Sequence, residues 1–72
     1  MSATETFLSD ILQREVSGLS PETPLRDIPG FDSIMMVRLM LKLEETLDRE
    51  LTDRELEGIE TMADVRLLAG LP

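Results

Sequence analysis

Apolar residues recur at helical spacing near the start of the chain. The spacing i, i+1, i+4, i+5 puts four of them on one face of a helix: Phe7, Leu8, Ile11 and Leu12. Ser2 and Glu5 have the Ser-x-x-Glu spacing of a capping box, which is typical of a helix start. We therefore predict a helix over residues 3–16, which Gly18 would end.

A longer apolar run predicts the central helix, over about residues 32–48. At about 100° per residue, one side of this helix forms a core stripe: Met36, Leu39, Met40, Leu43 and Leu47. A Thr-x-x-Glu capping box at Thr52 predicts a short helix that ends by Gly58. Thr61 would cap a last helix, whose inner stripe consists of Met62, Val65, Leu68 and Ala69.

The connection over residues 17–32 is rich in Pro and Gly, which interrupt helices and strands. It also holds four large apolar residues: Leu19, Leu25, Ile28 and Phe31. A solvated linker would not carry so many, so we predict an ordered loop that inserts these side chains into the core. Long loops in compact domains are uncommon and often functional.

These elements predict an all-α fold, since no segment alternates apolar and polar residues as a strand would. We expect a single domain over residues 1–72, folded as a small four-helix bundle. It would have three main helices, one short helix and the long ordered loop between the first two. A helical bundle suits so short a chain because its contacts are local.

The central helix carries a second apolar stripe, here named the outer stripe: Ile34, Val37 and Leu41. It lies roughly 140° from the core stripe by helical geometry, among charged residues that should face water. Two interpretations are open. Either another segment of the chain covers the outer stripe, or it is a docking surface for a partner.

The composition excludes several classes of function. The chain has 15 acidic and 7 basic residues, and no His or Cys. We therefore expect no catalytic residues and no metal site, because the usual general base, nucleophilic thiol and metal ligands are missing. So acidic a chain is not expected to bind nucleic acid or a membrane. Its N-terminus lacks the basic region of a secretion signal, which predicts a cytoplasmic location.

Ser33 is the residue with the clearest potential for chemistry. A serine at a helix start commonly serves as the N-cap. Asp32 could fill that role instead, which would leave the Ser33 hydroxyl facing outward on the first turn. With no His and a single lysine, Lys42, the chain offers little to activate this hydroxyl. A reaction at Ser33 would need an outside enzyme, and the helix N-terminus would favour a covalently attached phosphate.

The sequence around Ser33 resembles the D-S-[LI] signature of acyl carrier and peptidyl carrier proteins. The resemblance extends over nearly the whole chain. It includes the loop segment 23–27, the run 39–45 and the segments 51–53 and 59–65. It implies a carrier, not an enzyme, with a 4′-phosphopantetheine arm on Ser33. A thiol at the end of that arm would hold an acyl or aminoacyl group as a thioester.

The resemblance also implies partners: a phosphopantetheinyl transferase, and enzymes that load and process the acyl or aminoacyl group. The residues expected to contact them are Asp32, Ile34, Val37, Arg38, Leu41, Ile59 and Met62. We expect the carrier itself to be a monomer. The identity of its cargo is left open, because an arm-bearing carrier delegates recognition to its enzymes.

Three side chains depart from the family pattern. Met35 and Arg38 stand where fatty-acid carriers are commonly acidic, and Asp32 stands where many peptidyl carriers have histidine. The pattern favours a free-standing carrier in a dedicated nonribosomal peptide or polyketide pathway. The alternatives are a housekeeping fatty-acid acyl carrier protein and an unmodified helical adaptor that docks through the outer stripe.

Overall fold

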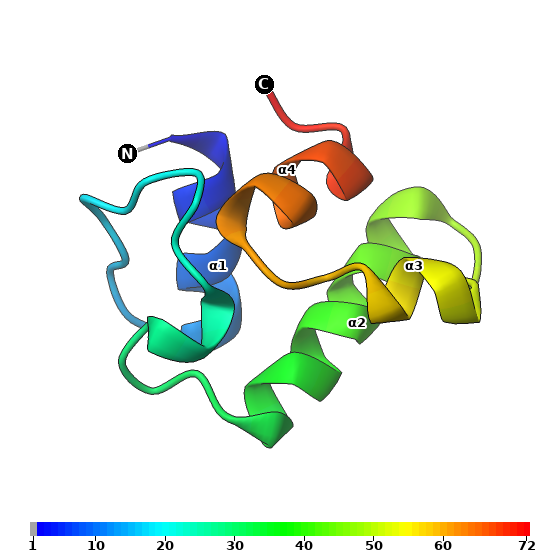
Figure 1. Ribbon diagram of the computed structural model, residues 1–72, viewed down its shortest axis with the longest axis horizontal. Coiled ribbons are helices and arrows are strands. Elements are labelled where there is room, and N and C mark those ends of the chain that lie inside the picture. Colours follow the sequence, from blue (N-terminus) through cyan, green and yellow to red (C-terminus); the bar gives the residue numbers. More distant parts are fainter. Residues whose placement is uncertain (1) are drawn as a thin grey trace.

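Three of the four α-helices surround the core, and a long loop closes it. The computed structural model describes residues 2–72 and is shown in Figure 1. Its elements in chain order are α1 (Ala3–Leu12), η1 (Leu25–Asp27), α2 (Ser33–Leu47), α3 (Asp53–Glu57) and α4 (Met62–Ala69). Over residues 2–72, the only extended pairing is an isolated bridge between Pro24 and Thr61. The predicted all-α bundle is confirmed.

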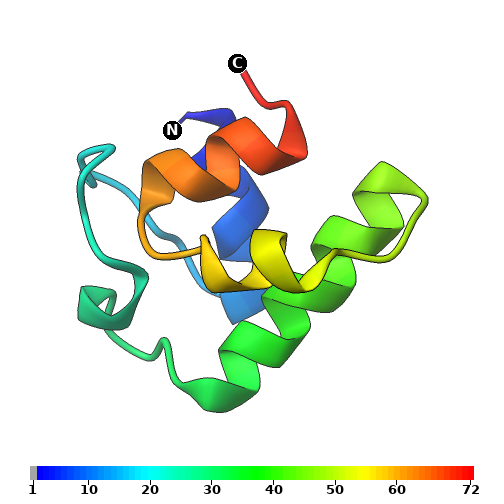
Figure 2. The same ribbon diagram turned by 45° about the vertical axis from the view of Figure 1, so that its right-hand side comes forward.

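The core lies where α1, α2 and α4 meet (Figures 1 and 2). Its fully buried side chains come from these helices and from η1: Leu8, Leu25, Leu39, Leu43 and Val65. Burying one such side chain contributes about 1.5–3 kcal/mol. The predicted core stripe of α2 is confirmed, since its other three members are half-buried and pack against the same cluster.

Three capping boxes begin the helices that the sequence assigns to them. Ser2, Thr52 and Thr61 each accept a hydrogen bond from the residue three positions later, whose carboxylate bonds back to the cap. The Glu5 carboxylate accepts from the N–H groups of Ser2 and Leu19, and these bonds hold its pKa below the ordinary value. The first box thus also fastens the loop to α1.

The first helix is shorter than predicted. It ends at Leu12, four residues before the expected end at residue 16, because Gln13 takes a left-handed conformation with φ 56°. The chain then turns so that Val16 enters the core with 4% of its surface exposed. The Ser9 hydroxyl accepts a hydrogen bond from the Val16 N–H at 2.9 Å, which supplies the partner that a continued helix would have given.

The long loop is ordered and packed against the core, as predicted. Leu25 and Ile28 are buried, and Leu19 and Phe31 are half-buried against the same cluster. The loop is also tied to the segment between α3 and α4. The Leu25 N–H donates to the Glu60 carbonyl at 2.9 Å, and another backbone bond of 3.1 Å joins Met62 to the loop. These bonds fix the path by which the chain enters α2.

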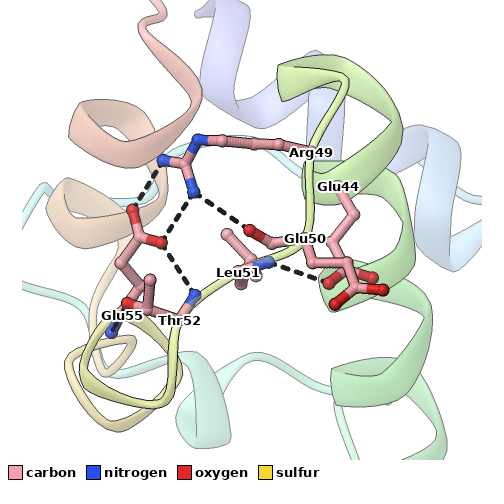
Figure 3. Close-up of polar contacts among 6 residues, drawn as sticks. All are labelled: Glu44, Arg49, Glu50, Leu51, Thr52 and Glu55. Carbon is pink, nitrogen blue, oxygen red and sulfur yellow. Dashed lines mark hydrogen bonds and ion pairs between the residues drawn. The ribbon is translucent and has the colours of Figure 1, made fainter.

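Arg49 links the end of α2 to α3 (Figure 3). Its guanidinium donates to both oxygens of Glu55, at 2.8 and 2.7 Å, and to the carbonyl of Glu50. The Leu51 N–H donates to a Glu44 oxygen at 2.9 Å, which holds the same linker against α2. None of the five residues of α3 is fully buried, and these polar bonds add to the packing of Leu56 against the core in fixing the position of the helix.

We expect the contribution of Glu55 to stability to depend on pH. Hydrogen bonds from Arg49 and then Thr52 lower the pKa of the Glu55 carboxyl from 4.5 to about 2. A carboxyl with a lowered pKa in the folded state stabilises the fold above its unfolded pKa, and this contribution is lost as the pH falls toward the folded value. The free energy of unfolding lost in Glu55→Gln should therefore be largest above about pH 5, fall as the pH is lowered, and vanish below about pH 2.

Urea unfolding at a series of pH values measures this difference. Glu57→Gln is the matched control, since Glu57 is an exposed glutamate of the same helix and makes no side-chain hydrogen bond among residues 2–72. Its effect should stay small at every pH. A difference for Glu55→Gln that stays constant between about pH 5 and 2 would contradict the assigned ion pair.

Candidate functional site

A tight turn brings the chain into α2. Pro29 and Gly30 occupy the two central positions of a turn closed by a 3.0 Å hydrogen bond from the Phe31 N–H to the Ile28 carbonyl. Gly30 has φ +85°, and a glycine after a proline is typical of a type II turn. A Cβ on Gly30 would also lie 3.3 Å from the Arg14 guanidinium. The positive φ therefore favours glycine at this point, and a Cβ would in addition require the Arg14 side chain to shift.

Asp32 is the N-cap of α2. Its side chain accepts a hydrogen bond from the Met35 N–H at 3.0 Å, and its carbonyl accepts from the Met36 N–H at 2.9 Å. Of the two capping arrangements that the sequence leaves open, the structure has Asp32 as the cap. Ser33 is consequently the first residue of the helix itself.

The Ser33 hydroxyl is free. Ser33 is exposed, and its side chain makes no hydrogen bond within residues 2–72. The backbone N–H groups of Ser33 and Ile34 likewise have no partner in this part of the chain, as is usual in the first turn of a helix. Apart from the Asp32 cap, no residue of that turn is acidic. The helix N-terminus therefore favours an anionic group on the Ser33 oxygen, through its free N–H groups and its dipole.

A groove of about 490 Å³ opens beside Ser33. It is formed by the loop around η1, the first turn of α2 and the segment between α3 and α4, and its apolar wall includes Phe31, Met36 and Ile59. Arg26 and Glu60 contribute charged groups to it. Sequence reasoning missed the groove, because its walls come from segments that only the folded loop brings together.

The outer stripe lies open on α2. Ile34, Val37 and Leu41 are exposed by 60%, 50% and 60%, and Arg38 is exposed beside them. No segment of residues 2–72 covers them, so the first of the two interpretations, a covering segment, does not hold for this part of the chain. Contact with a partner through these residues, and through Asp32, stays a prediction.

Ile59 and Met62 were expected to join the exposed surface around the outer stripe, but the structure buries them. Both side chains belong to the core, with 6% and 4% of their surfaces exposed. The reason is that the segment before α4 is tied to the long loop, which turns these two residues inward. Ile59 still reaches the groove beside Ser33, whereas Met62 lines a separate hollow near α1. We therefore keep Ile59 as a groove residue and assign no partner contact to Met62.

No histidine or lysine of residues 2–72 lies at Ser33 to activate it as a nucleophile. The amine of Lys42, its single lysine, lies 3.5 Å from the Asp10 carboxylate and 5.0 Å from the centre of the Phe7 ring, on the side of α1. The charged residues that share the groove with Ser33 are Arg26, Asp32 and Glu60. This arrangement suits a serine that an external enzyme modifies, and it does not suit a hydrolase.

Comparison with known proteins agrees with this geometry. Residues 5–66 match the family described as a phosphopantetheine attachment site. The chain is 34% identical over 59 residues to an acyl carrier protein of Clostridium perfringens, covering 82% of this chain and 78% of the relative. It is 38% identical over 69 residues to an acyl carrier protein of Syntrophobacter fumaroxidans, covering 90% and 85%. No solved structure gives a significant match.

The chain therefore belongs to the family of phosphopantetheine-binding acyl and peptidyl carrier proteins. Members of this family are carriers and not enzymes, and their prosthetic group is 4′-phosphopantetheine. The start of α2 fits such a group, since it combines a free hydroxyl, unpaired N–H groups and an adjoining groove. None of the helices in residues 2–72 combines the length and apolar character needed to cross a membrane.

Proposed function

We propose that Ser33 is the residue that carries the 4′-phosphopantetheine arm. The Ser33 oxygen would attack the pyrophosphate of coenzyme A on a phosphopantetheinyl transferase. A bond forms between the Ser33 oxygen and the phosphorus atom that bears the pantetheine, which gives a phosphodiester. The bond from this phosphorus to the bridging oxygen of the pyrophosphate breaks, and adenosine 3′,5′-bisphosphate leaves. The transferase takes up the hydroxyl proton, since this chain has no suitable base.

One observation carries this proposal. Asp32 caps α2, so the hydroxyl of Ser33 is exposed and makes no hydrogen bond within residues 2–72. A capping serine would have to give up its bond to the helix before it could react. Here modification leaves the cap intact, and the new phosphate comes to lie at the positive end of the helix dipole.

We further propose that the carrier serves a dedicated nonribosomal peptide or polyketide type of pathway, as a cytoplasmic monomer. Supporting this choice, Met35 and Arg38 occupy positions where the resemblance would give a fatty-acid carrier acidic residues. Enzymes that load and process the thioester would approach along the outer stripe and Asp32. The alternative is a housekeeping role in fatty-acid synthesis, and it is supported by the similarity to the two relatives named acyl carrier protein.

The proposal is tested by incubating the protein with coenzyme A and a broad-specificity phosphopantetheinyl transferase. The intact mass should rise by a single phosphopantetheinyl unit. The pathway is tested separately, by offering the resulting holo-protein to an adenylating enzyme with an amino acid and to a fatty-acid synthase malonyl transferase. Faster loading by the adenylating enzyme would support a nonribosomal peptide pathway, and faster loading by the malonyl transferase would contradict it.

A further inference from the structure

The charges of this chain are unevenly distributed over its surface. The first eleven residues of α2, Ser33 to Leu43, include two of the 7 basic residues and none of the 15 acidic ones. The remainder of the chain is strongly acidic. The helix that bears the outer stripe therefore has, over this length, the charge opposite to that of the protein as a whole.

Arg38 is the basic residue available to a partner. Lys42 pairs with Asp10 and lies over the ring of Phe7, so its charge is directed toward α1. Arg38 is exposed and forms no ion pair or side-chain hydrogen bond within residues 2–72. It follows Ile34 by four positions, which places it on the same face as the outer stripe.

The carboxylates of α2 lie too far along the helix to neutralise Arg38. Glu45 is seven residues away, about 10 Å at 1.5 Å per residue, which is about the distance over which salt screens exposed charges. Glu44 and Asp32 are each six residues from Arg38, about 9 Å along the helix axis. Both stay charged, but the Glu44 carboxylate is directed to the Leu51 N–H and the Asp32 carboxylate to the Met35 N–H.

We propose that the partner enzymes of this carrier meet the outer stripe with an apolar surface that bears a carboxylate opposite Arg38, and not with a basic surface. This inference rests on the proposed function, because it concerns the enzymes that reach Ser33. A basic surface would be attracted by the net charge of the chain but would place like charge against Arg38, which is unfavourable at close contact. A carboxylate on an apolar surface matches both the exposed aliphatic side chains and the unpaired guanidinium.

The test uses two phosphopantetheinyl transferases as probes, chosen because their carrier-binding surfaces have opposite charge. The surface of the first is apolar and bears carboxylates, and the surface of the second is rich in Lys and Arg. With coenzyme A in excess, kcat/KM for modification is measured with each. The wild type should prefer the first transferase. Arg38→Glu should lower kcat/KM with that transferase by about tenfold and raise it with the basic one. Both changes should shrink in about 1 M salt, where the screening length is about 3 Å.

Arg54→Glu is the matched control. It makes the same change of net charge at an exposed arginine of a different helix, α3, and should alter both values of kcat/KM by less than about twofold. A wild type that prefers the basic transferase, or an Arg38→Glu variant that behaves like the control, would overturn the inference. Failure of both transferases to add mass would instead overturn the proposed function.

Discussion

Replacing Leu39 by alanine is expected to remove most of the net stability of the fold at 25 °C. Leu39 is fully buried between α2 and the rest of the core. Truncating a buried leucine costs about 2–5 kcal/mol through lost burial and the cavity left behind. A domain this small, with no disulfide, has about 3–5 kcal/mol of net stability, so the loss takes up most of it.

Leu41→Ala is the matched control, because it makes the same truncation two positions further along α2. Leu41 is 60% exposed, so its replacement should change stability by less than about 0.5 kcal/mol. Urea unfolding followed by far-ultraviolet circular dichroism measures both variants. Equal loss of stability in the two would mean that α2 does not bury the face assigned to it.

Replacing Ser33 by alanine is expected to abolish phosphopantetheinylation while the fold persists. Because Asp32 and not Ser33 caps α2, the hydroxyl contributes little to the helix. Stability should change by less than about 0.5 kcal/mol, in place of the roughly 1 kcal/mol that loss of a cap costs. The mass gain seen with coenzyme A and a transferase should disappear completely.

Ser17→Ala controls for the loss of an exposed serine, since Ser17 lies in the loop after α1. This variant should be modified at the rate of the wild type. An unmodified adaptor that docks through the outer stripe would behave differently: neither variant would change its partner binding or the output of its pathway. Residual mass gain in Ser33→Ala would place the arm on another residue.

The helices were predictable because their signals are local. The capping boxes and the apolar periodicity lie within single segments, so the sequence suffices to place α2, α3 and α4 within a residue or two. The end of α1 was not predictable in this way. The sequence alone predicts that the helix continues to Val16. In the structure the Ser9 hydroxyl accepts a hydrogen bond from the Val16 N–H, and the Val16 side chain turns into the core.

The site was predictable in part. The local sequence left two possible caps for α2, Ser33 and Asp32. The hydrogen bond from the Met35 N–H to the Asp32 carboxylate shows that Asp32 is the cap. The groove and the burial of Ile59 depend on the loop pairing with the segment before α4, which involves residues more than thirty positions apart. No pattern along the chain encodes that contact, so neither feature could be foreseen.

The most direct measurement of the central claim is to locate the prosthetic group on the protein purified from its native host. Proteolysis followed by tandem mass spectrometry assigns the modification to one residue. The account predicts a single 4′-phosphopantetheine, joined through a phosphodiester to the oxygen of Ser33. A peptide in which Ser33 is bare throughout the purified protein, or an arm found on a different side chain, would contradict it.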